Sequence, residues 1–270
     1  MARRAEPHHT PPAARVTVSI VSHGHGEYVR HLLCDLEAAA SRIAKVIVTR
    51  NIPEADVLSD LALSFPLEFI DNAQPHGFGA NHNAAFRHCG SHWFLVLNPD
   101  VRIDPKAIGT LLDQAPPASG VVAPRIMEPG KTVPEPHREH LTPFEIMGRW
   151  FRPDYDAPQA EWVAGMFMLF PAAAFAEVGG FDEKFFMYVE DADICARLRL
   201  AGWRVSVNDS VRVLHDAQRA SDRHWRHLGW HWASMLKWWF SGAFWRLLAP
   251  GTPRLARAHA PESRARVQPK

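Results

Sequence analysis

The chain has 270 residues, of which 47% are hydrophobic and 22% are charged, and its formal net charge at pH 7 is +1. This composition is typical of a globular protein and excludes a largely disordered one. Both ends are basic, with three Arg and one Glu in residues 1–15 and four Arg, one Lys and one Glu in residues 251–270, so residues 16–250 carry a net charge of −5. An acidic body argues against a nucleic-acid-binding protein.

Short apolar runs alternate with helical patterns through the first half of the chain. This alternation predicts right-handed βαβ units, and hence an α/β fold with a Rossmann-like, mostly parallel central sheet flanked by helices. Ligands bind such sheets at the carboxyl ends of the strands, where the polar segments SHGHG, TRN, DNAQPHGFG and NPD fall. The predicted strands are 15–21, 45–49, 67–70, 93–97 and 121–123, and a predicted helix spans 78–88.

The second half begins with an irregular segment, residues 124–159, which is rich in Pro and His. It predicts a loop or insertion with a short helix near 144–151. We expect a basic tail at 1–14 and one domain over 15–221, made of the halves 15–123 and 124–221. The later patterns predict a helix at 191–200 and strands at 203–207 and 211–214.

Six of the ten tryptophans fall in the segment 222–250, which predicts a Trp-rich C-terminal helix followed by a basic tail at 251–270. Trp is favoured where one end of the side chain is dry and the other is wet, as at a membrane surface. The helix is therefore expected to contact a membrane surface, or else to pack on its own domain or on a second copy in a homodimer. Charged residues interrupt it, which argues against a membrane-spanning helix.

Cysteine usage and the N-terminus indicate a cytoplasmic protein. Cys34, Cys89 and Cys195 are far apart and form no CxxC pair, so neither a disulfide framework nor a structural zinc site is expected. The first 14 residues contain no apolar stretch of the kind found in a signal peptide.

Asn98-Pro99-Asp100 follows directly on the apolar strand 93–97, so its side chains are expected at the ligand edge of the sheet. A carboxylate there can hold a divalent cation that bridges a nucleotide diphosphate, although the same residues are also common in turns. His215 ends the last predicted strand, and imidazole can bind Mn²⁺ or donate a hydrogen bond to a phosphate.

Glu190, Asp191 and Asp193 lie at the start of the helix predicted at 191–200. Acids at a helix N-terminus are common because they cap the helix and compensate its dipole. Here they follow the apolar run FFMYV, and burial raises the pKa of a carboxylate toward the range that suits a general base. Asp193 and Arg197 are four residues apart and are expected to pair across the helix.

The segment from Gly77 to Asn83 differs from two common nucleotide-binding loops. It lacks the Lys of a P-loop, which disfavours ATP hydrolysis, and it is not a GxGxxG sequence after the first strand. Its small residues and amide side chains are suited to line a nucleotide pocket.

Taken in order, these segments resemble the inverting glycosyltransferases of family 2, which have the GT-A fold, and in particular their rhamnosyltransferase-like branch. The similarity runs from Val16 to Ser221. It is carried by five segments in the order and spacing of that family: VSIVSHG, HGFGANHNAAF, LVLNPDV, the block from AGMFM to LAGWRV, and VLHDAQRAS.

The resemblance implies a metal-dependent hexosyltransferase that uses Mg²⁺ or Mn²⁺ and builds bacterial cell-surface polysaccharide. The donor would be a nucleotide-diphosphate sugar, either dTDP-L-rhamnose or a UDP-hexose. The acceptor would be a glycan or lipid-linked hydroxyl at the inner face of the membrane. Asp191 would be the general base with Glu190 beside it, and Asp100 and His215 would bind the metal. The nucleotide sugar would contact Ser22, His23, Asn51, Asp71, Gly77, Phe78, Asn83, Asn98 and Asp100, and the acceptor would contact Trp162, Gly165 and Met166.

Three departures from the family pattern put the identity of the donor in question. Asn98 stands where the metal-binding motif usually has its first Asp, and Pro75 stands where the nucleotide segment usually has Asn. Arg50 precedes Asn51 where the family usually has an acid, which leaves Asp71 as the candidate for that contact. The alternatives are a non-catalytic nucleotide-sugar-binding or scaffold protein of the same fold, and a nucleotidyltransferase, which would need a basic loop that SHGHGEY does not provide.

Overall fold

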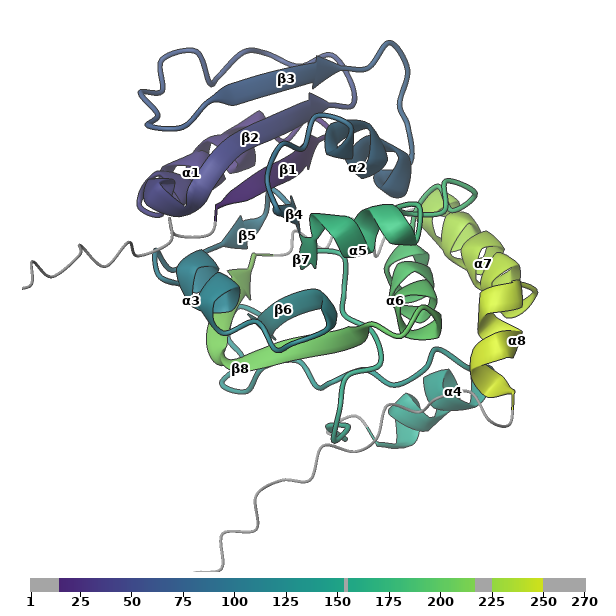
Figure 1. The fold of residues 1–270 in the computed structure, drawn as a ribbon. Helices are drawn as coiled ribbons and strands as arrows, with labels where there is room; N and C mark the ends of the chain where they lie inside the picture. The colour runs from purple at the N-terminus through teal and green to yellow at the C-terminus, as the bar shows by residue number, and fades with distance from the viewer. Residues whose placement is uncertain (1–14, 153–154, 217–224, 250–270) are drawn as a thin grey trace, which may run out of the picture.

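The computed structural model describes residues 15–152, 155–216 and 225–249, which form an eight-stranded sheet with helices on both faces (Figure 1). The strand order is β3-β2-β1-β4-β7-β6-β8-β5. The two predicted tails and residues 217–221 of the predicted domain lie outside the described residues. The strands are β1 (Val16–Ser22), β2 (Ile43–Arg50), β3 (Leu67–Asp71), β4 (Trp93–Leu97), β5 (Val101–Arg102), β6 (Ser119–Met127), β7 (Phe167–Pro171) and β8 (Arg204–His215).

The first four strands in this order are parallel, as the alternation of strands and helices predicted. Their side chains alternate between the two faces of the sheet, so that Val16, Val18 and Ile20 of β1 enter one apolar core while Thr17 and Ser19 point to the other face. Helices α1 (Gly26–Glu37) and α3 (Ala107–Asp113) cover the first face. Helices α2 (Phe78–Phe86), α5 (Ala172–Glu177) and α6 (Glu190–Leu200) cover the second, and a 3₁₀ turn spans Ala40–Arg42.

The second half of the sheet is mixed. Strand β7 is antiparallel to both β4 and β6, while β6 and β8 are parallel to each other. Strand β6 continues to Met127, so the predicted irregular segment begins later than expected. The two strands predicted at 203–207 and 211–214 form the single strand β8, because a register shift beside Asn208 takes up the intervening residues without ending the pairing with β6.

The Trp-rich C-terminal segment forms two helices, α7 (Trp225–Trp239) and α8 (Gly242–Leu248), where one was expected. The helical conformation is interrupted before Ser241, whose hydroxyl accepts a hydrogen bond from the Phe244 N–H at 3.1 Å and caps α8. Trp238 is fully buried and donates to the Leu141 carbonyl at 3.0 Å, next to the short helix α4 (Pro143–Phe151) that was predicted at 144–151. This segment therefore packs on its own domain. None of the helices in the described ranges has both the length and the hydropathy that crossing a membrane requires.

Candidate active site

The carboxyl ends of β1 and β2 carry the first predicted site residues. Ser22 is fully buried, and its hydroxyl donates to Glu54 Oε2 at 2.7 Å and accepts from the His25 N–H at 3.1 Å. His23 is exposed beside it, and partial burial together with the positive charge of His25 lowers the pKa of His23. Glu54 was missed from the sequence, because residues 51–66 lack any periodic pattern.

Asn51 is buried and organises the loop before α2. Its Oδ1 accepts hydrogen bonds from the Asn72 side chain and from the His76 N–H, both at 2.8 Å, while its Nδ2 donates to the His76 carbonyl at 3.0 Å. Asn72 donates in turn to Asn81 Oδ1 at 2.7 Å. Asn72 and Asn81 were not singled out, although the abundance of amide side chains in this segment was the signal for them.

Asp71 was the candidate to replace the acid that the family usually has before Asn51. In the structure its carboxylate is not free but is paired with Arg50. Arg50 and Asp71 are register partners on β2 and β3, and the guanidinium donates to both carboxylate oxygens, at 2.6 and 3.0 Å. The Arg50 guanidinium also lies 4.7 Å above the Phe69 ring. The charge of Asp71 is therefore compensated by the very residue that replaces the usual acid.

Gly77 and Phe78 lie where the predicted half 15–123 contacts the predicted half 124–221. A Cβ on Gly77 would lie 2.6 Å from the Phe186 carbonyl oxygen, so only glycine allows this approach. The Phe78 N–H donates to that same carbonyl at 2.9 Å. The Phe78 ring lies against Gly165, where an added Cβ would be 3.2 Å from the ring. Met166, the next predicted acceptor-side residue, accepts from the Asn98 N–H at 3.0 Å.

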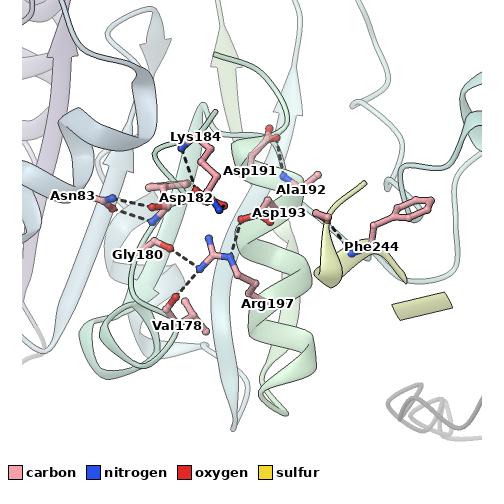
Figure 2. A network of polar contacts seen from close by, with 12 residues as sticks. Asn83, Val178, Gly180, Asp182, Lys184, Asp191, Ala192, Asp193, Arg197 and Phe244 are labelled. Atoms are coloured by element: carbon pink, nitrogen blue, oxygen red, sulfur yellow. Dashed lines mark hydrogen bonds and ion pairs between the residues drawn. The ribbon is translucent and has the colours of Figure 1, made fainter. Parts of the chain in front are cut away.

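The Asn83 side chain is held by the loop before α6, and its predicted contact with the donor stays a prediction. Its amide donates to the Phe181 carbonyl at 2.9 Å and to Glu183 at 3.0 Å, and its Oδ1 accepts from the Phe181 N–H at 2.9 Å. Figure 2 shows hydrogen bonds of the Asn83 side chain to the left of α6. Both ends of the amide are therefore occupied by the polypeptide.

The expected pair of Asp193 and Arg197 forms on α6, with Nε 2.7 Å from Oδ2 (Figure 2). Arg197 also donates to the carbonyls of Val178 and Gly180 at 2.6 and 2.7 Å, where the chain leaves α5. Asp193 thus anchors α6, through Arg197, to the loop that follows α5.

Glu190 and Asp191 lie at the N-terminus of α6, after two residues in a strained conformation. Tyr188 and Val189 both have φ of +72°, a region that a β-branched residue such as Val rarely adopts. Asp191 accepts hydrogen bonds from the Gly165 N–H at 3.0 Å and from the Ala192 N–H at 2.8 Å. These two hydrogen bonds fix the Asp191 carboxylate between the first turn of α6 and the segment that contains Gly165.

The two carboxyl groups differ in their surroundings. Burial raises the pKa of Glu190 to about 8, and the charge of Asp191 adds to this shift. Its Oε2 is buried without a hydrogen-bond partner among the described residues. Burial also raises the pKa of Asp191, but the Ala192 N–H, the charge of Arg138 and the Gly165 N–H act in the opposite direction. The single negative charge of the pair is therefore best accommodated on Asp191.

Trp162, a predicted acceptor-side residue, packs against Arg138. It is buried, its indole donates to the Glu139 carbonyl at 2.7 Å, and the Arg138 guanidinium lies 4.9 Å from its ring. Trp162 therefore positions Arg138, whose charge reaches Asp191.

Asp100 and His215 are brought together although 115 positions separate them in the sequence. Antiparallel pairing of β5 with β8 places Val101 opposite His215, and the His215 Nε2 lies 3.3 Å from Asp100 Oδ2. This hydrogen bond raises the pKa of His215. The other carboxylate oxygen, Asp100 Oδ1, is buried without a hydrogen-bond partner among the described residues.

An unpartnered carboxylate oxygen beside an imidazole fits a divalent metal ion. The described residues hold no group of three or more His, Cys, Asp or Glu side chains that could bind a metal by themselves. The pair therefore suits a cation that takes its remaining ligands from a bound phosphate group and water.

Sequence comparisons identify relatives across most of the chain. Residues 17–182 match the protein family described as Glycosyl transferase family 2, and residues 149–220 match the one described as N-terminal domain of galactosyltransferase. The chain is 27% identical over 274 residues to the N-acetylglucosaminyl-diphospho-decaprenol L-rhamnosyltransferase of Mycobacterium tuberculosis H37Rv, covering 84% of this chain and 89% of that protein. It is 26% identical over 226 residues to the rhamnosyltransferase WbbL of Escherichia coli K12, covering 75% of this chain and 83% of that protein.

Two solved structures resemble the fold at low sequence identity. The mannosyltransferase PcManGT from Pyrobaculum calidifontis, in complex with GDP-Man and Mn²⁺, has a TM-score of 0.59 and 16% identity, covering 86% of this chain and 68% of that chain. S. aureus TarS 1-349 in complex with UDP-GlcNAc has a TM-score of 0.56 and 14% identity, covering 76% and 59% of the two chains. These likenesses confirm the predicted GT-A fold.

Proposed function

Since the chain belongs to glycosyl transferase family 2, we propose that it moves a hexosyl group, with inversion, from a nucleotide-diphosphate donor to a hydroxyl of a lipid-linked acceptor in cell-surface glycan synthesis. The relatives from M. tuberculosis and E. coli are named as rhamnosyltransferases, which supports L-rhamnose as the sugar. The name of the first describes an acceptor in which a sugar is joined to a lipid through a diphosphate.

One observation carries this proposal: the Asp191 carboxylate is held by two backbone N–H groups at the start of α6, next to a second carboxyl group whose pKa is about 8. Burial raises the pKa of Glu190 to about 8, while the Ala192 and Gly165 N–H groups and the charge of Arg138 favour the ionised form of Asp191. Asp191 is then the general base, which accepts the proton of the acceptor hydroxyl as that oxygen attacks the anomeric carbon of the donor. Glu190 can donate a hydrogen bond that orients the acceptor.

The donor would lie across the carboxyl ends of β1, β2 and β4. Asp100 and His215 would hold Mg²⁺ or Mn²⁺, and such a cation neutralises the charge that develops on a leaving diphosphate. Ser22 and Asn51 are already hydrogen-bonded to the chain, so they shape the wall of the nucleotide pocket through the loops that they fix. Gly77 and Phe78 close this wall toward the acceptor side.

Calorimetric titration of UDP, dTDP and GDP into the full chain, with and without Mn²⁺, tests the donor part of the proposal. Metal-dependent binding of dTDP supports a rhamnosyl donor, while binding of UDP alone favours a UDP-hexose. If the folded protein binds none of the three, the donor site is lost and the non-catalytic alternative replaces this proposal.

Asp100→Ala examines the metal contribution in the same titration. Because the carboxylate is removed, we expect nucleotide binding in the variant to become independent of Mn²⁺. Metal-sensitive binding in Asp100→Ala would assign the cation to other groups.

We also propose that the C-terminal helices contact the inner surface of the cell membrane. Leu228, Trp232 and Leu236 are spaced four residues apart on α7 and are each at least half exposed, and Phe240 is 83% exposed. The chain then continues into the basic segment 251–270, which suits anionic lipid. Sedimentation with anionic and with neutral vesicles tests this placement. A concentration-dependent dimer that binds neither vesicle would assign the apolar face to a second copy.

A further inference from the structure

A cavity of about 310 Å³ lies within the irregular segment that follows β6, beside the candidate active site. Strands β4 and β6 are both antiparallel to β7, so they run in the same direction and their carboxyl ends lie at the same edge of the sheet. The cavity is thus at the ligand edge, on the acceptor side. Its lining includes Lys131, His137, Arg138, Arg152 and Tyr155.

Three permanent cations face this cavity. The Arg152 guanidinium lies 4.8 Å from the Tyr155 ring and has no carboxylate partner in the described part of the chain. Lys131 and Arg138 each pair with an acid three residues away, Glu128 and Glu135, at 2.5 Å. Lys131 is about half exposed, so it can turn to an incoming anion at little cost. Arg and Lys arranged around a cavity favour phosphate groups.

Helix α4 gives the cavity a second property. Glu145, Gly148 and Arg152 follow one another at helical spacing and line the cavity. One position earlier on the helix, Phe144, Met147 and Phe151 repeat the same spacing and are 79%, 53% and 80% exposed. Helix α4 and its C-cap residue therefore bring one cation, Arg152, and one acid, Glu145, to the cavity, while Phe144, Met147 and Phe151 lie exposed beside them.

We propose that this cavity binds the diphosphate group of the lipid-linked acceptor, with the lipid leaving along Phe144, Met147 and Phe151 and the acceptor sugar directed toward Asp191. Arg138 connects the two places, because it lines the cavity and its charge acts on Asp191. The assignment rests on the proposed function for the identity of the acceptor. The binding of a lipid diphosphate can nevertheless be measured without any transfer reaction.

The first experiment is the titration of farnesyl diphosphate into the full chain in EDTA, so that no metal ion can bridge the diphosphate to Asp100 and His215. Because the double variant Lys131→Gln/Arg152→Gln removes two charged hydrogen-bond donors, it should bind about 100-fold more weakly than wild type. The matched control is Arg87→Gln/Lys106→Gln, which removes one exposed Arg and one exposed Lys elsewhere and should bind as wild type. Equal affinity of the two double variants overturns the proposal. So does inorganic pyrophosphate that binds as tightly as farnesyl diphosphate, because the apolar face of α4 would then contribute nothing.

The second experiment compares two acceptors, N-acetylglucosaminyl-diphospho-farnesol and octyl N-acetylglucosaminide, which differ in the diphosphate. Lys131→Gln/Arg152→Gln should raise KM about 100-fold for the first acceptor with kcat retained, and should leave KM for the second unchanged. An unchanged KM for the diphosphate acceptor refutes the subsite while transfer itself stands. If wild type transfers to neither acceptor but Lys131→Gln/Arg152→Gln still weakens farnesyl diphosphate binding, the proposed function is refuted and the subsite stands.

Discussion

Replacing Glu190 by Gln tests the electrostatics of the candidate active site through protein stability. The pKa of Glu190 rises from 4.5 to about 8 in the folded chain, mainly because the carboxyl group is buried. Between these two pH values the folded chain keeps a proton that the unfolded chain has released, so the stability of the wild-type protein falls as the pH rises through this window. At 1.36 kcal/mol per pKa unit, the shift corresponds to a loss of about 5 kcal/mol by pH 9.

Gln has nearly the same shape as Glu and cannot ionise. Glu190→Gln should therefore exceed the wild type in stability by about 5 kcal/mol at pH 9 but by only about 1 kcal/mol at pH 5.5, and calorimetric Tm differences should be about 10 °C and 3 °C. Glu27→Gln is the matched control, because Glu27 is exposed on α1 and the charge change is the same. If Glu190→Gln and Glu27→Gln show the same small difference from wild type at both pH values, burial does not shift the titration of Glu190 and the reasoning is refuted.

Two further variants separate chemistry from scaffold. Asp191→Asn keeps the shape of the side chain but removes the base, so we expect transfer to fall by a factor of about 100–10,000 while nucleotide affinity and Tm stay near wild type; retained transfer in enzymatic assays would move the base to Glu190. Asn83→Ala leaves the buried N–H and carbonyl of Phe181 without partners, so we expect a loss of about 2 kcal/mol in urea unfolding with unchanged nucleotide affinity. Weaker nucleotide binding in Asn83→Ala would indicate that Asn83 does contribute to the donor pocket.

Strands could be predicted from the sequence where a short apolar or β-branched run is bounded by polar segments, as in β1 and β4. Strand β7 could not, because FMLFP lies inside a longer apolar stretch in which periodicity does not separate strand from helix. The continuity of β8 was also missed. The polar residues around Asn208 indicate a turn, but strand β6 pairs with the residues on both sides of them, so that β8 continues as one strand.

The pairing of Asp100 with His215 was expected from the family resemblance, and the two residues meet through the antiparallel pairing of β5 with β8, although β5 was not itself predicted. The direction of an individual side chain could not be predicted from the sequence. Asn83 and Asn51 share a residue type and a predicted role, yet Asn83 faces the backbone of Phe181 while Asn51 holds the loop at His76. Such choices depend on which backbone groups lack partners after the chain has folded, and this information lies in the tertiary structure.

The strained residues before α6 explain why two acids can sit in a buried place at all. A φ of +72° at both Tyr188 and Val189 costs about 1–3 kcal/mol for each residue, and the burial of the Val189 side chain offsets part of this cost. Without the turn that these angles produce, the chain would continue along its previous direction and Glu190 would not enter the core. Asp191 then accepts hydrogen bonds from the Ala192 N–H in the first turn of α6 and from the Gly165 N–H of the segment before β7. The burial of Glu190 and the anchoring of Asp191 thus depend on contacts between segments far apart in the sequence, which makes the difference between the two acids a property of the fold and not of their order in the sequence.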